Sequence, residues 1–435
     1  MSADEGASTL PGGPSDGLLD ADRLLERLVE LHEASLSWQR CSRLELFHRS
    51  SVTLRVSSTD GGANPVTQVG NDEGIAARVE RPGERGSFFA ASSGCDEAKL
   101  RWTLDHALRG RPEIQDGAEG WPSDRATSLI DHDPDVRLPS PVEMGSWLTR
   151  AMEAAAGGAR GRSVGEVLRG WVEAALTVES WVAEMGMRSS RRRLRAWAMV
   201  HVREKAGAER VLPVASRTWK ELPPEGWARL MGERGVPRRR RRVSEPGKTT
   251  VMFTPETSAA LIAALTRSVH LGPQETGFPV GPGWSLTDDP QHPEALSGGL
   301  FDDAGFYTAS TRLASGGDIV GNLNGEGHFR RSSFRDRPSA HPAHLVVDCQ
   351  PRKLPDRGLL VSDLRIHPLR LNRWMLEFEA YPLPDGLEAD ARIVGHAKVA
   401  PRQLLWHCAA CLEPRRFSSR GVSTGSLLFE DLDVA

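Results

Sequence analysis

The second half of the chain is a series of short apolar runs separated by Gly and Pro, and this pattern limits the folds open to it. The runs continue from Thr249 to Val434, with one clear helical pattern at Pro255–Val269. Short apolar runs bounded by Gly and Pro are typical of strands, whereas a longer run with a period of 3.6 is typical of a helix. We therefore predict that residues 246–435 form a mostly β domain that carries one main helix.

The first half, residues 18–245, changes repeatedly between helical and extended patterns. Leu18–Leu36 and Asp96–Leu108 have apolar residues at helical spacing, and Ser163–Ala174 has the pattern of an amphipathic helix. Arg43–Val79 contains alternating stretches that predict strands. The expected fold class is therefore α+β, with an N-terminal α+β region followed by the mostly β domain.

Four segments have compositions typical of tails, loops or turns. Residues 1–17 are rich in Gly, Ser, Pro and acid, without the basic start or apolar segment of a signal peptide, and are expected to be a disordered tail. Residues 111–145 are rich in Pro, Asp and Gly, which predicts a linker. Arg238–Arg242 is interpreted as a solvated Arg-rich loop, and Ser189–Arg193 as a second basic turn.

Composition and charge narrow the class of protein. A net charge of -3 over 435 residues gives no general attraction to nucleic acid. No apolar stretch approaches the roughly 18–20 residues needed to span a bilayer, so no membrane partner is expected. The five cysteines are odd in number and scattered, which fits a reducing cytoplasm better than a disulfide framework.

Two short patterns contain residue types that bind metals. His32-Glu33 is the chain's only His-Glu pair, but no second His follows one helical turn later, so it cannot chelate zinc as a peptidase helix would. Cys408 and Cys411 have CxxC spacing next to His407, but no second CxxC completes a structural zinc site. These residues by themselves leave two interpretations open, small buried thiols and metal ligands.

Several ordered segments resemble the TldD/PmbA family of peptidase subunits. Val251–Leu261 is similar to the strand and Pro-Glu opening of the family's metal-binding helix, and Ser285–Pro290 to its Asp-Asp-Pro turn. Leu300–Gly305 resembles its Phe-Asp-Asp-Glu-Gly segment, and Arg330–Arg335 its Arg-Arg-Glu-Ser segment. The resemblance covers most of the chain and is densest over residues 250–350.

The resemblance implies that the usual metal site is absent here. In TldD-type subunits the helix carries His-Glu-x-x-x-His, and the matching positions in this chain are Ala263, Ala264 and Ser268. The family's third ligand is a Cys near the C-terminus, and Cys411 lies about where that residue would be. His270 lies two residues beyond the last expected ligand, about 200° around the helix, which makes it a poor substitute. One thiolate without two imidazoles cannot define a catalytic zinc site.

A chain of this kind resembles the TldE-type subunits, which pair with a metal-bearing TldD-type subunit. The implied function is that of a non-metal-binding subunit in a metallopeptidase complex that cleaves unstructured peptides, as in the maturation of a small peptide product. This chain would bind no cofactor, and zinc would lie in the TldD-like partner. The resemblance also makes Arg330, Arg331 and Arg335 candidates for binding carboxylates of a peptide or of the partner.

Two alternative functions belong to other classes. A lone metalloenzyme could draw rearranged ligands from a set of five residues: His270, His328, His407, Cys408 and Cys411. A non-enzymatic binding protein could use Arg238–Arg242 for an acidic protein or a nucleic acid, although the near-neutral net charge argues against nucleic acid.

Overall fold

The structure of the 435-residue chain is a computed structural model, and it describes most of the chain in segments. The described residues are 25–26, 28–30, 32–33, 41–59, 65–84, 87–110, 129–132, 136–157, 166–183, 188–203, 209–220, 222, 239–243, 246–268, 284–321, 323, 327–331, 333–336, 338–349, 353, 355–370, 373–383, 385, 391–401, 404, 408–418 and 421–435.

Three long helices and two large sheets make up the described fold, in addition to a short helical segment within residues 25–33. The helices are α2 (Glu97–Arg109), α3 (Pro141–Gly157) and α5 (Pro255–Ser268). The strands of the first half are β1 (Arg43–Thr59), β2 (Val66–Glu80), β3 (Ser87–Ser93), β4 (Leu129–His132), β5 (Glu166–Ala183), β6 (Arg188–Arg203) and β7 (Glu209–Ser216). The strands of the second half are β8 (Arg239–Arg242), β9 (Gly247–Phe253), β10 (Trp284–Asp288), β11 (Thr311–Ser315), β12 (Asp318–Ile319), β13 (Phe329–Arg330), β14 (Ser339–Ala340), β15 (Leu345–Cys349), β16 (Gly358–Leu369), β17 (Arg373–Leu383), β18 (Ala391–Val399), β19 (Cys408–Ser418) and β20 (Val422–Val434).

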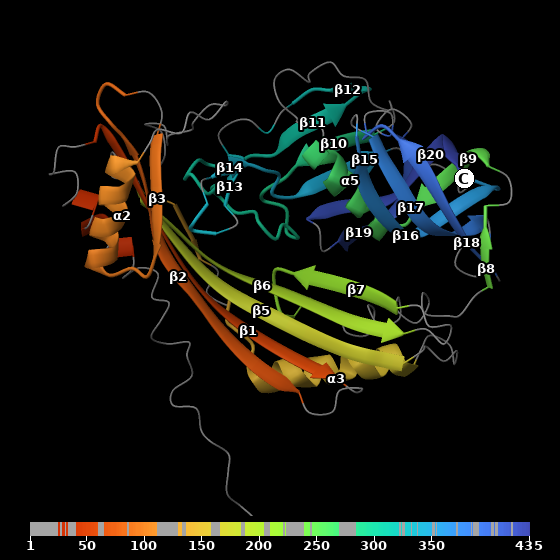
Figure 1. Ribbon diagram of the computed structural model, residues 1–435, viewed down its shortest axis with the longest axis horizontal. Coiled ribbons are helices and arrows are strands. Elements are labelled where there is room, and N and C mark those ends of the chain that lie inside the picture. The colour runs from red at the N-terminus through yellow and green to blue at the C-terminus, as the bar shows by residue number, and fades with distance from the viewer. Residues whose placement is uncertain are drawn as a thin grey trace, which may run out of the picture.

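The two sheets divide the chain into an N-terminal and a C-terminal half. The first sheet has the strand order β3-β2-β1-β5-β6-β4, with β7 paired to β6. The second has the order β12-β11-β10-β15-β20-β9-β16-β17-β18-β8, with β19 paired to β20. In Figure 1 the long strands β1, β2, β5 and β6 curve beneath the second sheet, and α3 lies on their far side. The mixed character of the fold, with many strands and few helices, is therefore as predicted.

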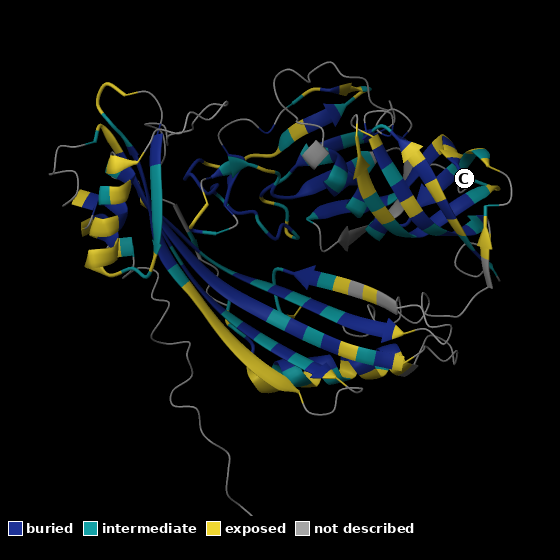
Figure 2. Ribbon diagram, in the orientation of Figure 1, coloured by how far each residue is buried: buried dark blue, intermediate teal, exposed yellow. Residues whose placement is uncertain are grey.

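The two faces of the N-terminal sheet have different roles, because successive side chains of a strand point to opposite faces. One face packs the apolar residues of β1, β5 and β6, such as Leu54, Leu176 and Leu194, against Trp147 and Leu148 of α3. The other face is turned toward the C-terminal half and carries polar and aromatic residues. Figure 2 shows the resulting pattern of burial along these strands. This second face forms one wall of the candidate site.

The C-terminal sheet holds α5 against its centre. Strand β9 lies between β20 and β16, and α5 begins directly after it and packs on β20, β16, β19 and β9. Phe253, Leu261 and Leu265 contribute to a large buried core with Phe429. The helix that the sequence predicts at Pro255–Val269 is thus confirmed over Pro255–Ser268.

Helix boundaries in the first half follow from local capping. Asp96 caps α2 by accepting a hydrogen bond of 2.8 Å from the backbone N–H of Lys99. At the start of α3, Ser140 Oγ accepts from the N–H of Glu143, and the Glu143 carboxylate accepts from the N–H of Ser140, at 3.2 and 2.6 Å. This reciprocal pair is a capping box, and Pro141 occupies the first helical position, where a missing N–H does no harm.

Three sequence predictions about the first half are wrong where the structure describes the residues. The amphipathic segment 163–174 was predicted to be a helix, but from Glu166 onward it is strand β5, paired with both β1 and β6. The predicted linker 111–145 contains strand β4 and the first turn of α3. The predicted basic turn at Ser189–Arg193 is part of strand β6.

The Arg-rich segment also differs from its prediction as a loop. Arg239–Arg242 forms strand β8, which pairs in parallel with Ala391–Val394 of β18 at the edge of the second sheet. The C-terminal unit therefore includes residues before the predicted boundary at 246. The predicted tail 1–17 lies outside the described residues. Within the described part of the chain, no helix has both the length and the apolar character required to cross a lipid bilayer.

The contact between the halves predicts an unusual sensitivity at Gly74. A Cβ atom at Gly74 would lie 2.1 Å from Cε2 of Phe334, a fully buried ring from the C-terminal half. We expect Gly74→Ala to destabilise the protein by about 1–3 kcal/mol, because the buried ring would have to shift to admit the methyl group. The measurement is the midpoint of urea-induced unfolding.

Gly145→Ala is the matched control for this substitution. A Cβ atom there, in α3, meets nothing within 4 Å. We expect it to stabilise the chain by about 0.5–1 kcal/mol, because Ala loses less backbone entropy than Gly in a helix. Equal midpoints for the two variants would show that Phe334 does not hold the halves together at this point.

Candidate functional site

A cavity of about 370 Å³ lies between the N-terminal sheet and α5. Arg195 and Trp197 of β6 line it from the first half, and Ala263 and Thr266 of α5 line it from the second. The remaining wall comes from loops of the C-terminal half and from strand β15: Leu296, Ser297, His341, Pro342, Ala343, Leu345 and Gly421. The helix that resembles a metal-binding helix therefore faces a cavity between the two halves.

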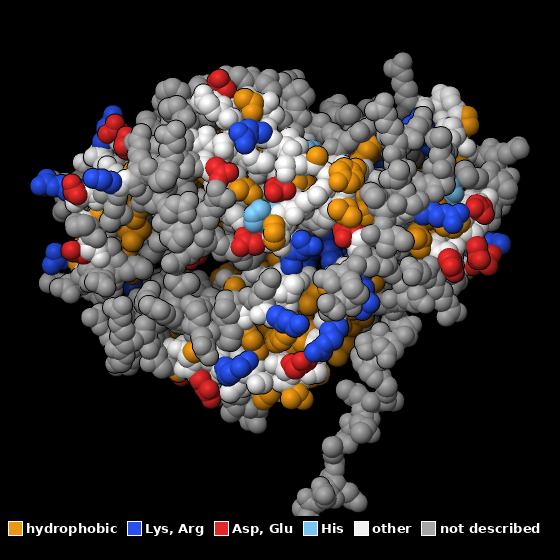
Figure 3. All heavy atoms as spheres, turned by 180° about the vertical axis from the view of Figure 1, so that it is seen from behind, with side chains coloured by type: hydrophobic (Ala, Val, Ile, Leu, Met, Phe, Trp, Pro, Cys, Tyr) orange, Lys and Arg blue, Asp and Glu red, His pale blue; other side chains and the backbone are white. Residues whose placement is uncertain are grey.

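A smaller cavity of about 280 Å³ lies along the same strand. Arg191–Leu194 of β6 line it together with Asp131 of β4 and with Arg217, which follows β7. Viewed from behind, the molecule carries Lys and Arg side chains near the middle of this face (Figure 3). Both cavities are thus bordered by the arginines of a single strand.

Strand periodicity explains why the arginines gather on one wall. Arg191, Arg193, Arg195 and Trp197 alternate along β6, so their side chains share the face turned toward the C-terminal half. The neighbouring strand β5 places Glu179 opposite Arg191 on the same face. The wall is therefore basic, with one carboxylate at its inner end.

Arg195 supplies a cation to the larger cavity. Burial lowers the pKa of Arg195 to about 10, with Glu179 opposing that shift and Arg49 adding to it. The pKa still lies well above neutral pH, so the guanidinium remains charged. A guanidinium beside a cavity can bind a carboxylate through two parallel hydrogen bonds.

Where their side chains are described, the α5 positions that match the family's metal ligands carry only alanine. Ala263 lies on the cavity wall and is 8% exposed, and Ala264 packs partly against the core of the second half. Ser268 is the last residue of α5, and its side chain lies outside the described part. Neither alanine offers a donor atom, so this face of the helix cannot hold zinc with the family's usual ligands.

The other predicted ligand positions are only partly described. Cys411 lies in β19, opposite Leu427 of β20, and α5 packs on β19. The backbone carrying Cys411 thus lies in a strand against which the helix packs, while its side chain lies outside the described part, as does His270 altogether. His328 is held by Asp288 and Thr311 at 3.0 Å each, and Cys408 is buried at the start of β19. Neither His328 nor Cys408 joins a group of metal-ligand atoms among the described residues.

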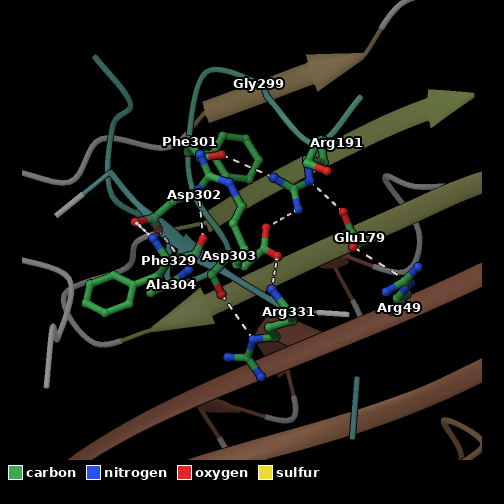
Figure 4. Close-up of polar contacts among 12 residues, drawn as sticks. Arg49, Glu179, Arg191, Gly299, Phe301, Asp302, Asp303, Ala304, Phe329 and Arg331 are labelled. Atoms are coloured by element: carbon green, nitrogen blue, oxygen red, sulfur yellow. Dashed lines mark hydrogen bonds and ion pairs between the residues drawn. The ribbon is translucent and has the colours of Figure 1, made fainter. Parts of the chain in front are cut away.

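The segment Phe301-Asp302-Asp303 joins the two halves, and we call its contact with the N-terminal sheet the seam (Figure 4). The ring of Phe301 packs edge-on against Trp181 of β5, with ring centroids 5.0 Å apart. Trp181 donates its indole N–H to the carbonyl of Asp303 at 3.0 Å. The Asp303 carboxylate accepts a short hydrogen bond from Arg191.

Arg191 bridges two carboxylates within the seam. Its Nε donates to Glu179 at 2.5 Å, and Arg193 donates to the same Glu179 oxygen at 2.7 Å. Burial alone would raise the pKa of Glu179, but the positive charges of Arg191, Arg193 and Arg49 outweigh burial and hold it below its ordinary value. The Glu179 carboxylate is therefore charged, as its pairing with buried arginines requires.

Asp302 orders the loop that presents Asp303. One of its carboxylate oxygens accepts from the N–H groups of Ala304 and Phe306, at 2.9 and 3.0 Å. The other accepts from Gly327 and Phe329, at 2.9 and 3.1 Å. One aspartate thus fixes the local backbone while the next reaches across to the first sheet.

The structure gives the three arginines of the 330–335 segment internal partners, whereas the sequence suggested a peptide or partner subunit. Arg331 is buried and donates to Glu45 at 2.6 Å and to the Asp303 carbonyl at 3.1 Å. Arg330 is buried and donates to two carbonyls of its own loop. Arg335 is exposed, but it contacts Ser93 and Asp72 of the first half at 2.9 and 3.6 Å. Arg331 and Arg335 therefore contribute to the contact between the halves, and Arg330 orders its own loop.

Sequence reasoning missed Arg195 and Trp197, which line the cavity from the first half. Their strand was correctly predicted from Leu194 onward, but the basic residues before it were interpreted as a turn. The alternation of Arg191, Arg193 and Arg195 was the available signal, because a period of two places all three on one face.

Comparisons with known proteins place this fold. No family model matches the chain, and no curated protein matches its sequence. Among solved structures, TldE from Thermococcus kodakarensis is 16% identical with a TM-score of 0.72, over 95% of this chain and 100% of that chain. A protein of Thermotoga maritima described as a candidate modulator of a DNA gyrase is 15% identical with a TM-score of 0.72, over the same shares. A similarly described protein of Bacteroides thetaiotaomicron is 15% identical with a TM-score of 0.70, over 96% of this chain and 99% of that chain.

The chain therefore has the TldE fold over nearly its whole length. The resemblance inferred from ordered sequence segments is confirmed at the level of the fold. Because the identities are low, the comparison supports the architecture alone. The chemistry of the site follows from the residues of this chain.

The seam predicts a strong effect of one isosteric substitution. Asp303→Asn keeps the shape of the side chain but removes one of the two carboxylate charges that pair with Arg191 in the interior. We expect a loss of about 3–5 kcal/mol of unfolding free energy, as for a broken buried ion pair. Urea-induced unfolding measures it, with Asp318→Asn at the exposed first residue of β12 as the control. An Asp303→Asn midpoint equal to the control's would mean that the network does not hold the halves together.

Proposed function

We propose that this chain is the subunit without a catalytic metal in a TldD/TldE-type peptidase complex. It would line a peptide-binding chamber together with a metal-bearing, TldD-like partner, which would supply the zinc and cleave the peptide bond. Support comes from the TldE fold and from Ala263 and Ala264, the alanines at two of the family's metal-site positions on α5. The observation that carries the proposal is that Ala263 faces a cavity between the two halves with a methyl group.

The alanines at positions 263 and 264 of α5 limit the chemistry of this chain. A zinc peptidase uses imidazoles to hold the ion and a carboxylate as a general base for the attacking water. Position 264 is Ala, so no carboxylate is available there as a base. In the proposed complex this chain therefore binds and orients the peptide, and the partner performs hydrolysis.

The cavity offers groups that suit an extended peptide. Trp197 provides an aromatic surface and Arg195 a cation on one wall, while Ala263 and Thr266 leave room on the other. An aromatic surface favours apolar side chains, and a guanidinium favours carboxylates. The proposed substrate is thus an unstructured peptide, with a preference for acidic groups near Arg195. The proposed compartment is the cytoplasm.

The first test is complementation with a TldD-like partner. The purified chain alone is expected to leave an unstructured peptide intact, because it lacks the base and the imidazoles on α5. Mixing it with a subunit that carries His-Glu-x-x-x-His should produce cleavage, and zinc removal from that subunit should abolish it. Cleavage by the chain alone that survives removal of contaminating proteases would contradict the proposal.

The second test concerns the charge of the chamber. In the active complex, Arg195→Gln should raise KM for a peptide with acidic side chains by about tenfold or more, as expected for a lost hydrogen bond to a charged group. The KM for a neutral peptide of the same length should change little. Steady-state kinetics with the two peptides measures the difference.

Two variants make this second test specific. Arg195→Lys keeps the charge and should restore part of the preference, although without bidentate geometry. Arg203→Gln removes an exposed arginine at the far end of the same strand and should change neither KM. Equal effects of Arg195→Gln on the KM of both peptides would show that Arg195 does not distinguish acidic from neutral peptides.

A further inference from the structure

A second group of metal-binding residue types lies in the N-terminal half, away from α5. His48 of β1, Glu73 of β2 and Cys95, just before α2, each offer one ligand atom, and these atoms all lie within 4.8 Å of one another. The Glu73 carboxylate oxygen Oε1 lies 3.2 Å from Nε2 of His48 and 3.1 Å from Sγ of Cys95. An imidazole, a carboxylate and a thiol thus converge on one point.

The fold holds the three residues in place independently of one another. In the β1–β2 pairing, Ser50 lies opposite Glu73 and His48 opposite Ile75, so His48 and Glu73 are diagonal neighbours on one face of the sheet. His48 is 1% exposed, which fixes its ring by packing. Gly94 donates its N–H to the carbonyl of Glu73 at 2.9 Å and has φ +87°, a left-handed conformation that favours glycine and brings Cys95 beside Glu73.

The observed distances are close to those of a tetrahedral zinc site. Zinc bonds of about 2.0–2.1 Å to nitrogen and oxygen and about 2.3 Å to sulfur place N and O about 3.3 Å apart, and S and O about 3.5 Å apart. The two distances in the structure are 3.2 and 3.1 Å. Shifts of a few tenths of an ångström would therefore admit an ion, which would replace the proton of the Cys95 thiol.

We propose that His48, Glu73 and Cys95 form a binding site for a divalent zinc-type ion. Cys S, His N and Glu O are all ligands that zinc accepts, and three protein ligands leave a fourth position for water. Glu73 and Cys95 are half-buried, so an ion can reach the site from solvent. This inference departs from the expectation of a metal-free chain, which rested on α5 alone.

The ion would stabilise the N-terminal half, on the face of the first sheet opposite the one that meets the C-terminal half. It would join β1, β2 and the start of α2, three segments separated in sequence. Arg335 of the C-terminal half contacts Asp72 and Ser93, which lie next to Glu73 and near Cys95. Zinc binding is therefore expected to raise the thermal stability of the chain, since a ligand that binds only the folded state stabilises it.

Another His-containing group has a less suitable geometry. His292, Glu294 and His344 also have ligand atoms within 4.8 Å of one another. The two imidazole rings are stacked, with centroids 4.5 Å apart and planes 13° from parallel. Ring nitrogens bind a metal in the plane of the ring, so two stacked, nearly parallel rings are poorly oriented to share one ion. These residues therefore supply a control.

The experiment uses the full-length chain, stripped with a chelator and titrated with Co²⁺ and then with Zn²⁺. Co²⁺ bound to a thiolate gives a charge-transfer absorption band in the near ultraviolet, and competition with a chromophoric chelator gives zinc affinity. The variants are Cys95→Ser and His48→Gln, with Cys41→Ser and His292→Gln as controls. Thermal unfolding with and without zinc is measured on each.

The proposal makes a distinct prediction for each variant. The natural chain should show the thiolate band and a zinc-dependent rise in thermal stability. Cys95→Ser should lose the band, and both site variants should bind zinc at least about tenfold more weakly. Both controls should behave as the natural chain. A site variant counts as folded if its thermal unfolding without zinc matches that of the natural chain.

Two outcomes of the Co²⁺ titration would overturn the assignment. One is the absence of a thiolate band in the natural chain at saturating Co²⁺. The other is a band that persists in Cys95→Ser, which would place the thiolate at another cysteine. If the site variants bind less zinc but the controls lose it equally, the effect is not specific and the assignment also fails.

Discussion

The buried network of Asp303, Arg191 and Glu179 determines how the two halves of the chain are placed. Charges withdrawn from water must be paired, so this network tolerates only one arrangement of the C-terminal loop on the first sheet. Arg195 lies four residues beyond Arg191 on β6, about 13 Å along a strand. The seam fixes one end of this strand against the C-terminal half, and the cavity lies further along it. The seam therefore contributes to placing α5 opposite Trp197.

The local sequence was sufficient to predict those elements whose start signal and apolar pattern both lie within the element. The helix at Pro255–Ser268 has its start signal and its apolar face in one segment, and α2 has its capping Asp96. Segment 163–174 failed because its apolar residues fit either period, and the structure decides in favour of a strand by pairing β5 on both sides. For α3 the signal was present, since Ser140-Pro-Val-Glu143 is a capping box, but it lay within a segment whose Pro and Asp content suggested a linker.

The candidate site shows the same division between local and distant information. The lack of metal ligands at Ala263 and Ala264 can be found in the sequence because it concerns residue types at known spacing on one helix. The role of Arg331 could not be found in this way, because its partner Glu45 is 286 residues away. By composition alone, an Arg pair in a Pro-flanked segment resembles an exposed binding loop. Only the fold shows which carboxylates the arginines contact. Distant pairing also explains why Arg195 and Trp197 were missed as cavity residues.

The charge balance around the cavity gives the proposed chamber a physical preference. Arg49, Arg191, Arg193 and Arg195 all act on Glu179, whereas Asp303 is the other carboxylate that acts on Arg195. The cations therefore outnumber these carboxylates, and the repulsion among them destabilises the empty arrangement. A bound carboxylate near Arg195 would relieve that repulsion and would also gain hydrogen bonds to a guanidinium that is partly shielded from water. A neutral peptide could use only Trp197 and the small side chains of α5, so selectivity for acidic peptides would come from binding rather than from the chemistry of cleavage.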